Sequence, residues 1–399
     1  MTVLSMSGGA LRAPAPLAGF IILYMLLYSA FGVASPFLPS FIEARGVPPE
    51  QIGMLFAAGT AIRLVSAPLA GRLADRTGAL RLTLAVCALA TATAALGYLP
   101  ARAFWSILGV SLLHAFALAP TTNLADALAL VASKAPSGRF EYGWVRGAGS
   151  AAFILGSLLT GLAIATYGLW VIIALQAMLM LAVPFAVRLV PPVVVPPDEG
   201  AMRISRAGIA ELLRLRMFRR IVLVAALILG SHAMHDTFAI IRWTGAGISP
   251  SGASILWSLS VAAEVVVFLL IGPWLLRVLT PAGAIALAAL AGAARWLVAA
   301  CTADVAALAL TQPLHGITFA LLHLACMRLL VANVPSQLAA TAQAIYGTVG
   351  VGIATALLTL ISGWLYARMG PAAFAVMSVL CLAALPLAVG LRGGEKQLA

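Results

Sequence analysis

The stretch that decides the fold is residues 71–81, GRLADRTGALR. It is a short, charged turn between two long apolar runs, residues 50–70 and 82–99, and such a turn lies at a membrane surface. Its glycines let the backbone turn and the helices approach closely, and its aspartate places an acceptor beside a cation. We predict that this turn is a latch between helix ends, a cytoplasmic gate that includes Gly71, Arg72, Asp75, Arg76 and Gly78.

The composition is that of a polytopic membrane protein. The chain has 399 residues, of which 63% are hydrophobic and 9% are charged, a balance that soluble domains do not approach. A helix needs about 20 apolar residues to cross the hydrocarbon layer of a bilayer. We predict an all-α protein with twelve transmembrane helices near residues 17–42, 50–71, 79–99, 103–132, 144–166, 168–188, 218–241, 250–276, 282–302, 305–331, 336–365 and 371–391.

The positive charges are divided unequally between the two sides of the membrane. Of the 24 Lys and Arg residues, eighteen fall in connections on one side, two lie inside spans, and four fall on the other side, Arg45, Arg102, Arg242 and Arg368. Cytoplasmic connections retain Lys and Arg, so we predict a bacterial-type inner (plasma) membrane protein with both termini cytoplasmic. Topology and contact with anionic lipid then explain the net charge of +12, and nucleic-acid binding is not needed.

The chain divides into two halves with a related pattern. Glycines recur 201 or 202 positions apart, in the pairs Gly71/Gly272, Gly149/Gly350, Gly161/Gly363 and Gly168/Gly370. Parallel repeats of this kind hold their substrate between them, near the membrane midplane. We predict a six-helix bundle in residues 1–188, a cytoplasmic linker with an amphipathic basic helix in residues 189–217, and a second six-helix bundle in residues 218–399. The second copy of the latch, residues 272–277, has no acidic residue, so the two inner gates are unequal.

Polar side chains inside the first-half spans are candidates for a substrate cavity. Tyr24 and Tyr28 lie on one stripe at helical spacing, which faces either a cavity or a lipid interface. Arg63 lies about 20 Å into its span, where an arginine needs a partner or water. Asn123 follows a proline that opens its helix locally. Asp126 has two open roles, pairing with the arginines of residues 71–81 in the gate or contacting the substrate.

The second half carries acidic and histidine side chains at mid-span. His232 and Asp236 are four residues apart and share a helix face, with His235 adjacent to the aspartate. Glu264 lies about 21 Å from the outer end of its span, where burial favours the neutral carboxyl group and suits it to carry a proton if its exposure alternates. A permanent hydrogen bond to an arginine is the structural alternative. We predict proton coupling at Glu264, Asp236 and His232.

Other mid-span polar and aromatic residues complete the predicted substrate cavity: Trp257, Arg295, Gln312, His315, Gln343 and Tyr346. His323 is interpreted as a packing residue. His232, His235 and Asp236 are suitable metal ligands by type, but adjacent residues on a helix point about 100° apart and no second cluster completes a ligand set, so we expect no metal site. The four cysteines lie apart in apolar runs, and the chain contains no catalytic triad context or nucleotide motif. We therefore predict no cofactor and no enzymatic activity.

Several motifs resemble those of known membrane carriers. Residues 71–81 resemble the loop between the second and third helices of major facilitator transporters, G-x-x-x-D-R-x-G-x-x-[RK]. Further stretches resemble the phenylpropionate permease branch of that superfamily, which is similar to the nucleoside and lactose proton symporters: residues 32–40, 51–53, 142–147, 230–233, 256–264, 295–296, 314–319 and 343–346. The resemblance covers nearly the whole chain and is most specific in the second half.

This resemblance implies a monomeric carrier that takes up small organic solutes, aromatic acids among them, together with protons. It places Glu264, His232 and His315 in the polar core. The chain departs from the branch after residue 233, where aromatics give way to Met-His-Asp. The added acid either disfavours a simple carboxylate substrate or is neutralised by Arg242 or the histidines.

We therefore predict a carrier for a small-molecule substrate and protons that works by alternating access, with the substrate's anionic group paired by Arg63 or Arg295. An exporter of drugs or metabolites is the first alternative, because the latch motif is common to both directions of transport. A receptor or assembly factor on a carrier fold is the second. Only flux measurements separate the uptake carrier from the exporter. Replacement of both Glu264 and Asp236 tests the receptor or assembly factor.

Overall fold

The computed structural model describes residues 16–134, 140–192 and 206–392, and these parts of the chain contain helices and no strands. Within these described ranges, ten helices are long and apolar enough to cross a membrane. A further apolar helix, α4 (Leu80–Leu96), is shorter, with 17 residues. The last candidate span, Ser336–Val389, has 54 residues, far more than one crossing needs, and it turns at Gly370, where φ is +54°. The all-α membrane fold is confirmed, and the count of twelve spans stays a prediction.

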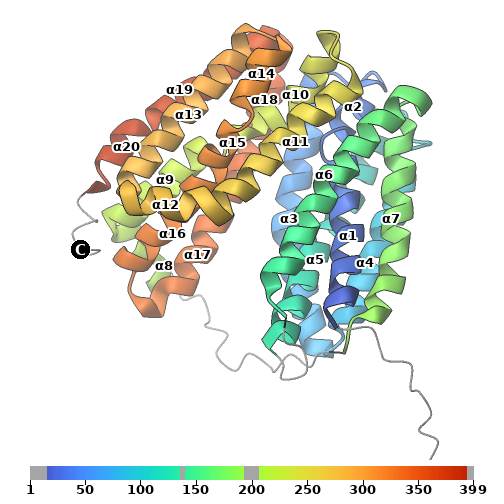
Figure 1. The fold of residues 1–399 in the computed structure, drawn as a ribbon, viewed down its shortest axis with the longest axis horizontal. Helices are drawn as coiled ribbons and strands as arrows, with labels where there is room; N and C mark the ends of the chain where they lie inside the picture. Colours follow the sequence, from blue (N-terminus) through green and yellow to red (C-terminus); the bar gives the residue numbers. More distant parts are fainter. Residues whose placement is uncertain (1–15, 135–139, 193–205, 393–399) are drawn as a thin grey trace, which may run out of the picture.

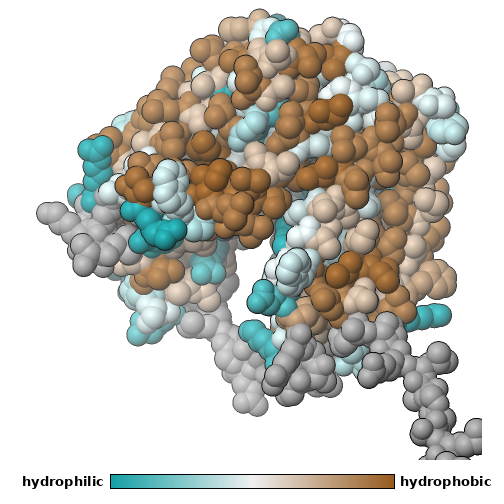
Figure 2. All heavy atoms as spheres, viewed as in Figure 1, coloured by the Kyte–Doolittle hydropathy of each residue, from teal (hydrophilic) through white to brown (hydrophobic). Residues whose placement is uncertain are grey.

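The first half of the chain forms the group of helices at the right of Figure 1. These helices are α1 (Pro16–Ala34), α2 (Leu38–Glu43), α3 (Pro49–Thr77), α4, α5 (Phe104–Lys134), α6 (Tyr142–Tyr167) and α7 (Trp170–Leu189). Their outward faces carry large apolar side chains that suit contact with lipid (Figure 2). The predicted linker falls largely on residues 193–205, which lie outside the described residues, as do residues 1–15 and 393–399, which carry the termini predicted to be cytoplasmic.

The second half has the same kind of spans, but most are built from several segments. They are α8 (Arg206–Arg214), α9 (Arg216–Ile228), α10 (His232–Gly245), α11 (Pro250–Val266), η1 (Val267–Ile271), α12 (Gly272–Val278), α13 (Pro281–Cys301), α14 (Val305–Thr311), α15 (Leu314–Gly316), η2 (Ile317–Leu321), α16 (Leu322–Asn333), η3 (Ser336–Leu338), α17 (Ala339–Ile345), η4 (Tyr346–Ile353), α18 (Ala354–Met369), η5 (Gly370–Ala373), α19 (Phe374–Ala383) and α20 (Leu385–Val389). The segments η1, η2 and η4 are π-helical, a local form that recurs at functional sites.

The two groups of helices meet closely at one end. Helix α3 packs against α18, and α6 packs against α11. Gly53 and Gly363 make the first contact possible, because a Cβ atom on Gly53 would lie 2.7 Å from the Cα of Gly363. Gly161 packs against Ser254 in the same way. Small residues therefore close this end, which is the outer side in the predicted topology.

The opposite end is open. Figure 2 shows a hollow between the two groups of helices with hydrophilic surface inside it. The turn at residues 71–81 belongs to this end: α3 stops at Thr77, and Gly78 caps it with a φ of +63°. Arg72, Asp75 and Arg76 are exposed there and make no hydrogen bond or ion pair within the described part of the chain. The predicted latch is therefore not engaged in this conformation.

Candidate functional site

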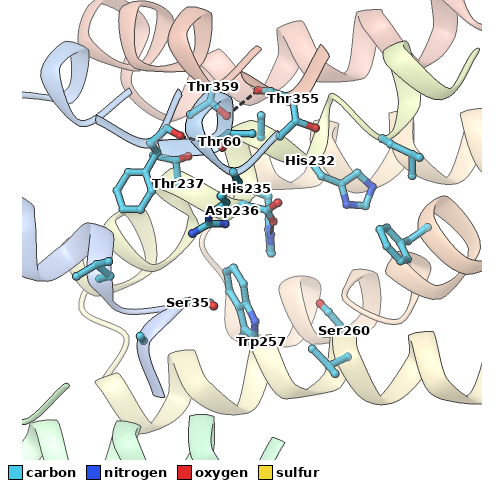
Figure 3. Close-up of a pocket in the computed structure, with 18 of the residues that line it drawn as sticks. Ser35, Thr60, His232, His235, Asp236, Thr237, Trp257, Ser260, Thr355 and Thr359 are labelled. Atoms are coloured by element: carbon cyan, nitrogen blue, oxygen red, sulfur yellow. Dashed lines mark hydrogen bonds and ion pairs between the residues drawn. The ribbon is translucent and has the colours of Figure 1, made fainter. Parts of the chain in front are cut away.

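A cavity of about 470 Å³ lies between the two halves. It is lined by polar side chains from both, including Ser35, Thr60, Arg63, His114 and Gln176 from the first half and His232, His235, Asp236, Thr237, Ser260, His315, Thr355 and Thr359 from the second. Figure 3 shows Trp257 on α11 beside His235 and Asp236 of α10, and the Trp257 ring stacks on the His235 ring with 4.9 Å between centroids. Apolar walls with a few convergent polar groups are typical of a small-molecule site.

The local backbone explains how α10 brings its histidines to the cavity. The helix that begins at Arg216 is interrupted after Ile228, and the Ser231 hydroxyl donates to the Ile228 carbonyl at 2.6 Å. Trp296 Nε1 donates to the same hydroxyl at 2.8 Å, which ties the break to α13. His232 is the first residue of the new helix, so its position is fixed by this break.

Arg295 is the centre of the polar network behind the cavity. Its side chain is 1% exposed, and its guanidinium lies 4.4 Å from the Trp296 ring centroid. Nη1 lies 3.0 Å from His315 Nδ1, and Nη2 lies 3.3 Å from His235 Nε2. Nη2 also donates to Gln312 Oε1 at 3.1 Å, an atom that accepts from Ser260 at 2.6 Å. A buried charge is tolerated when it is hydrogen-bonded in this way.

Arg295 also fixes the protons of both histidines. A guanidinium only donates, so the two ring nitrogens that face it must accept, and each histidine is neutral with its proton on the other nitrogen. In His315 that is Nε2, which lies 3.5 Å from Glu264 Oε2. In His235 it is Nδ1, which lies 3.4 Å from Asp236 Oδ1. One arginine therefore directs two N–H groups towards two carboxylates, an assignment that follows from the hydrogen-bond network.

Close packing brings Glu264 to His315. Gly316 packs against α11 so tightly that a Cβ atom there would lie 2.6 Å from the Ala263 carbonyl oxygen. The residue before this glycine is His315 and the residue after Ala263 is Glu264. The side chain of Glu264 is 25% exposed and that of His315 is 13% exposed. The pair is therefore both held in place and accessible from the space between the halves.

Comparison with known proteins identifies the family. Residues 18–376 match the MFS_1 like family. The chain belongs to that family. It is 32% identical over 365 residues to the probable 3-phenylpropionic acid transporter of Escherichia coli (strain K12), which covers 91% of this chain and 94% of that protein. This MFS_1-like protein is therefore a transporter and not an enzyme, and its predicted membership of the major facilitator superfamily is confirmed.

Solved structures share the fold of this MFS_1-like transporter. The nucleoside transporter NupG has a TM-score of 0.79 and 17% identity, over 96% of this chain and 99% of NupG. A bacterial homologue of the human lysosomal transporter Spinster, in an inward-facing and unoccupied conformation, has a TM-score of 0.65 and 16% identity, over 98% of this chain and 97% of that chain. These likenesses show that the present protein shares their fold.

Most of the predicted cavity residues of this transporter, together with the predicted proton-coupling residues His232 and Asp236, separate into three groups. Arg63, His232, His235, Asp236, Trp257 and His315 line the central cavity. Arg295 and Gln312 lie behind that lining and hold it. Asn123 and Gln343 line a second cavity of about 460 Å³, which shares Arg63 and Leu118 with the first and lies between α3, α5 and α17. The two cavities together form a path between the halves.

Three tyrosines and Asp126 have other partners than expected. Tyr24 is fully buried, and its hydroxyl donates to Asp126 Oδ1, which also accepts from Tyr142 at 2.8 Å. Asp126 therefore does not pair with the arginines of residues 71–81 in this conformation. Tyr28 lies under the Arg146 guanidinium, and the Tyr346 hydroxyl lies 3.4 Å from His323 Nδ1. The stripe of tyrosines on α1 supports the first bundle and does not line either described cavity.

The added acid, Asp236, is not neutralised by Arg242. The Arg242 guanidinium donates to the Thr302 carbonyl at 2.7 Å and lies over the Phe374 ring. Asp236 instead contacts His235, and its side chain is 54% exposed to the cavity.

His114 on α5 and Gln176 on α7 were not among the site residues predicted from the sequence. The structure places both in the cavity wall. One signal in the sequence could have identified Gln176. Its amide lies in the middle of the apolar helix Trp170–Leu189, where no neighbouring residue in the sequence can hydrogen-bond to it.

Proposed function

We propose that this transporter takes up a small organic acid together with protons by alternating access, with 3-phenylpropionate as the first candidate substrate. The relative with 32% identity is named for that acid. Three observations support the proposal: the cavity has aromatic walls, two arginines lie at or behind its lining, and the hollow between the halves is open at one end. We further propose that the protein acts as a monomer in a bacterial-type inner membrane with both termini cytoplasmic. The division into residues 1–188, 189–217 and 218–399 belongs to the same proposal.

The observation that carries this proposal is the pairing of Glu264 with His315 in front of Arg295. The charges near the cavity are two arginines, Arg63 and Arg295, and two carboxylates, Asp236 and Glu264, while the histidines bonded to Arg295 are neutral. With both carboxylates ionised the site has no net charge. Protonation of one carboxylate leaves one positive charge, which favours a monoanion. Proton and anion then stabilise the same state, which is the requirement for coupling.

Different roles in this cycle are proposed for the two carboxylates. The Glu264 side chain is 25% exposed, and its partner His315 both contacts Arg295 and lines the cavity. We propose Glu264 as the principal proton site, with Asp236 and His232 as the polar groups that complete it. His232 has an unpaired Nε2 and lies 4.9 Å from the His315 ring, centroid to centroid.

Gradient-driven uptake tests the proposal directly. Purified protein in liposomes is given labelled 3-phenylpropionate, a nucleoside and a sugar, with and without an inward proton gradient. We expect accumulation of the aromatic acid above equilibrium only with the gradient, and no accumulation of the neutral solutes. Accumulation that ignores the gradient contradicts proton coupling, and transport of the nucleoside or the sugar in place of the acid contradicts the substrate class.

If the carrier works by alternating access, a substitution that forces the closed end apart should expose the cavity to the outside. Gly53→Val places a side chain against the Gly363 backbone, and overpacking of this kind costs about 1–3 kcal/mol, enough to shift a two-state equilibrium about 5- to 100-fold. In a background without the native cysteines, a cysteine at the cavity residue Ser35 is expected to react faster with a membrane-impermeant maleimide added outside. Gly109→Val is the control, because a Cβ atom there meets nothing within 4 Å. Equal labelling rates in the two variants contradict the account.

A further inference from the structure

The first-half wall of the cavity contains buried polar atoms without partners. Gln176 is fully buried, and neither its Oε1 nor its Nε2 has a hydrogen-bond partner within the described part of the chain. His114 is 3% exposed, and its Nε2 likewise has no partner among the described residues. Both side chains line the cavity. Unpaired buried polar groups are unfavourable, so their presence in a cavity wall indicates a ligand that satisfies them.

Arg63 lines the same cavity as these two side chains. It comes from α3, lines the central cavity, and also borders a small side pocket of about 40 Å³ with His114 and Tyr98. Its side chain is exposed to this space and makes no hydrogen bond or ion pair within the described part of the chain. A charge inside a membrane span without a partner marks a substrate or ion pathway. A guanidinium has five donors in a planar fork that fits a carboxylate.

The second-half wall excludes the anionic end of a substrate. Asp236 is 54% exposed there and presents a negative charge to the cavity. Arg295, the other candidate cation, is 1% exposed, and its guanidinium is already occupied by His235, His315 and Gln312. The free hydrogen-bond donors for the anionic group of a substrate therefore lie on the first half, and the apolar contacts for its body lie on the second.

We propose that Arg63, His114 and Gln176 form a carboxylate subsite that fixes the orientation of the substrate. The proposal rests on the function proposed above. In this subsite the carboxylate accepts from the Arg63 guanidinium, Gln176 Nε2 and His114 Nε2. The apolar body of the acid then extends towards Trp257 and Phe319 of the second half. Bound in this way, one ligand contacts both halves and assists their closure around it.

Gln176→Leu separates a binding role from a structural one. The change removes two unpaired polar atoms from a buried position, so the ligand-free variant is expected to unfold at a higher temperature than the wild type. Stabilisation by 3-phenylpropionate is expected to need about 10- to 100-fold more ligand, the loss that follows removal of one hydrogen bond to a charged group. Gln337→Leu, which removes an exposed amide on η3 outside the cavity lining, is the control and should change neither value.

Arg63→Gln tests the charge. Thermal stabilisation is measured with 3-phenylpropionate and with its neutral amide, 3-phenylpropanamide. We expect the wild type to prefer the acid and the variant to lose that preference, because the amide never used the positive charge. If both Arg63→Gln and Gln176→Leu bind the acid as the wild type does, the subsite is overturned. Gradient-driven uptake by those variants would then leave the proposed function intact.

The subsite and the function fail in distinguishable ways. If the wild type binds the acid and both variants lose that binding, the subsite is supported. If the same wild type shows no uptake on a proton gradient, the transport proposal is contradicted. A wild type that neither acid nor amide stabilises contradicts both proposals.

Discussion

Arg295→Gln is expected to reduce gradient-driven uptake by about 100-fold or more, because removal of one member of a buried, hydrogen-bonded charged network typically costs 3–5 kcal/mol. Without the guanidinium, His235 and His315 lose the donor that fixes their tautomers, and neither N–H remains directed at a carboxylate. The measurement is the initial rate of labelled acid uptake into liposomes, normalised to folded protein.

Arg295→Lys is the matched control for charge. A lysine keeps the positive charge but is a point donor that cannot bridge two rings and an amide as the planar fork does. Uptake is therefore expected to stay well below the wild-type rate. Wild-type uptake by the lysine variant would mean that charge alone matters and would contradict the assigned geometry. Wild-type uptake by Arg295→Gln would remove the residue from the mechanism.

Glu264→Gln is expected to abolish accumulation while exchange continues. An amide keeps the shape of the protonated acid but cannot release a proton, so the carrier is held in the state that binds the anion. Labelled acid should still equilibrate against unlabelled acid across the membrane at a rate close to that of the wild type. Loss of coupling with retained exchange is the specific signature, because a misfolded variant loses both.

Glu50→Gln makes the same chemical change at an exposed position in the first turn of α3. This control should accumulate the acid as the wild type does. If Glu264→Gln also accumulates the acid on a gradient, the residue has a structural role and the proton site lies elsewhere.

Much of the fold could be predicted because a membrane span is a local property of the chain. The run expected at residues 282–302 is α13 (Pro281–Cys301), and its start is fixed by Thr280, whose side chain accepts from the Gly283 N–H at 3.1 Å. The interruptions could not be predicted in the same way. The π-helical segment η2 follows Gly316, whose close contact with Ala263 is made between distant parts of the sequence.

The candidate site was partly visible in the sequence because polar residues are rare inside apolar spans. His232, Asp236, Glu264 and Arg295 all stood out for this reason. Their connections did not, since Arg295 reaches partners 20 and 60 positions away. Spacing on one helix also could not reveal the partner of Tyr24, because its hydroxyl donates to Asp126 on another helix.

The latch at residues 71–81 shows why one conformation limits a prediction from sequence. Arg72, Asp75 and Arg76 are exposed and unpaired within the described part of the chain, at the end where the two halves stand apart, and the Gly53–Gly363 contact closes the opposite end. The position of the motif was predictable from the sequence. Its role as a gate stays a prediction, which a conformation with this end closed would test.

The central claim, that one acid molecule enters with protons through Glu264, is tested most directly by the pH outside weakly buffered liposomes. No gradient is imposed, and 3-phenylpropionate is added on the outside. The account predicts a transient rise in external pH with the wild type and no rise with Glu264→Gln, although that variant still exchanges labelled acid. Transport of the acid by the wild type without a rise in pH, or an equal rise with Glu264→Gln, would contradict it.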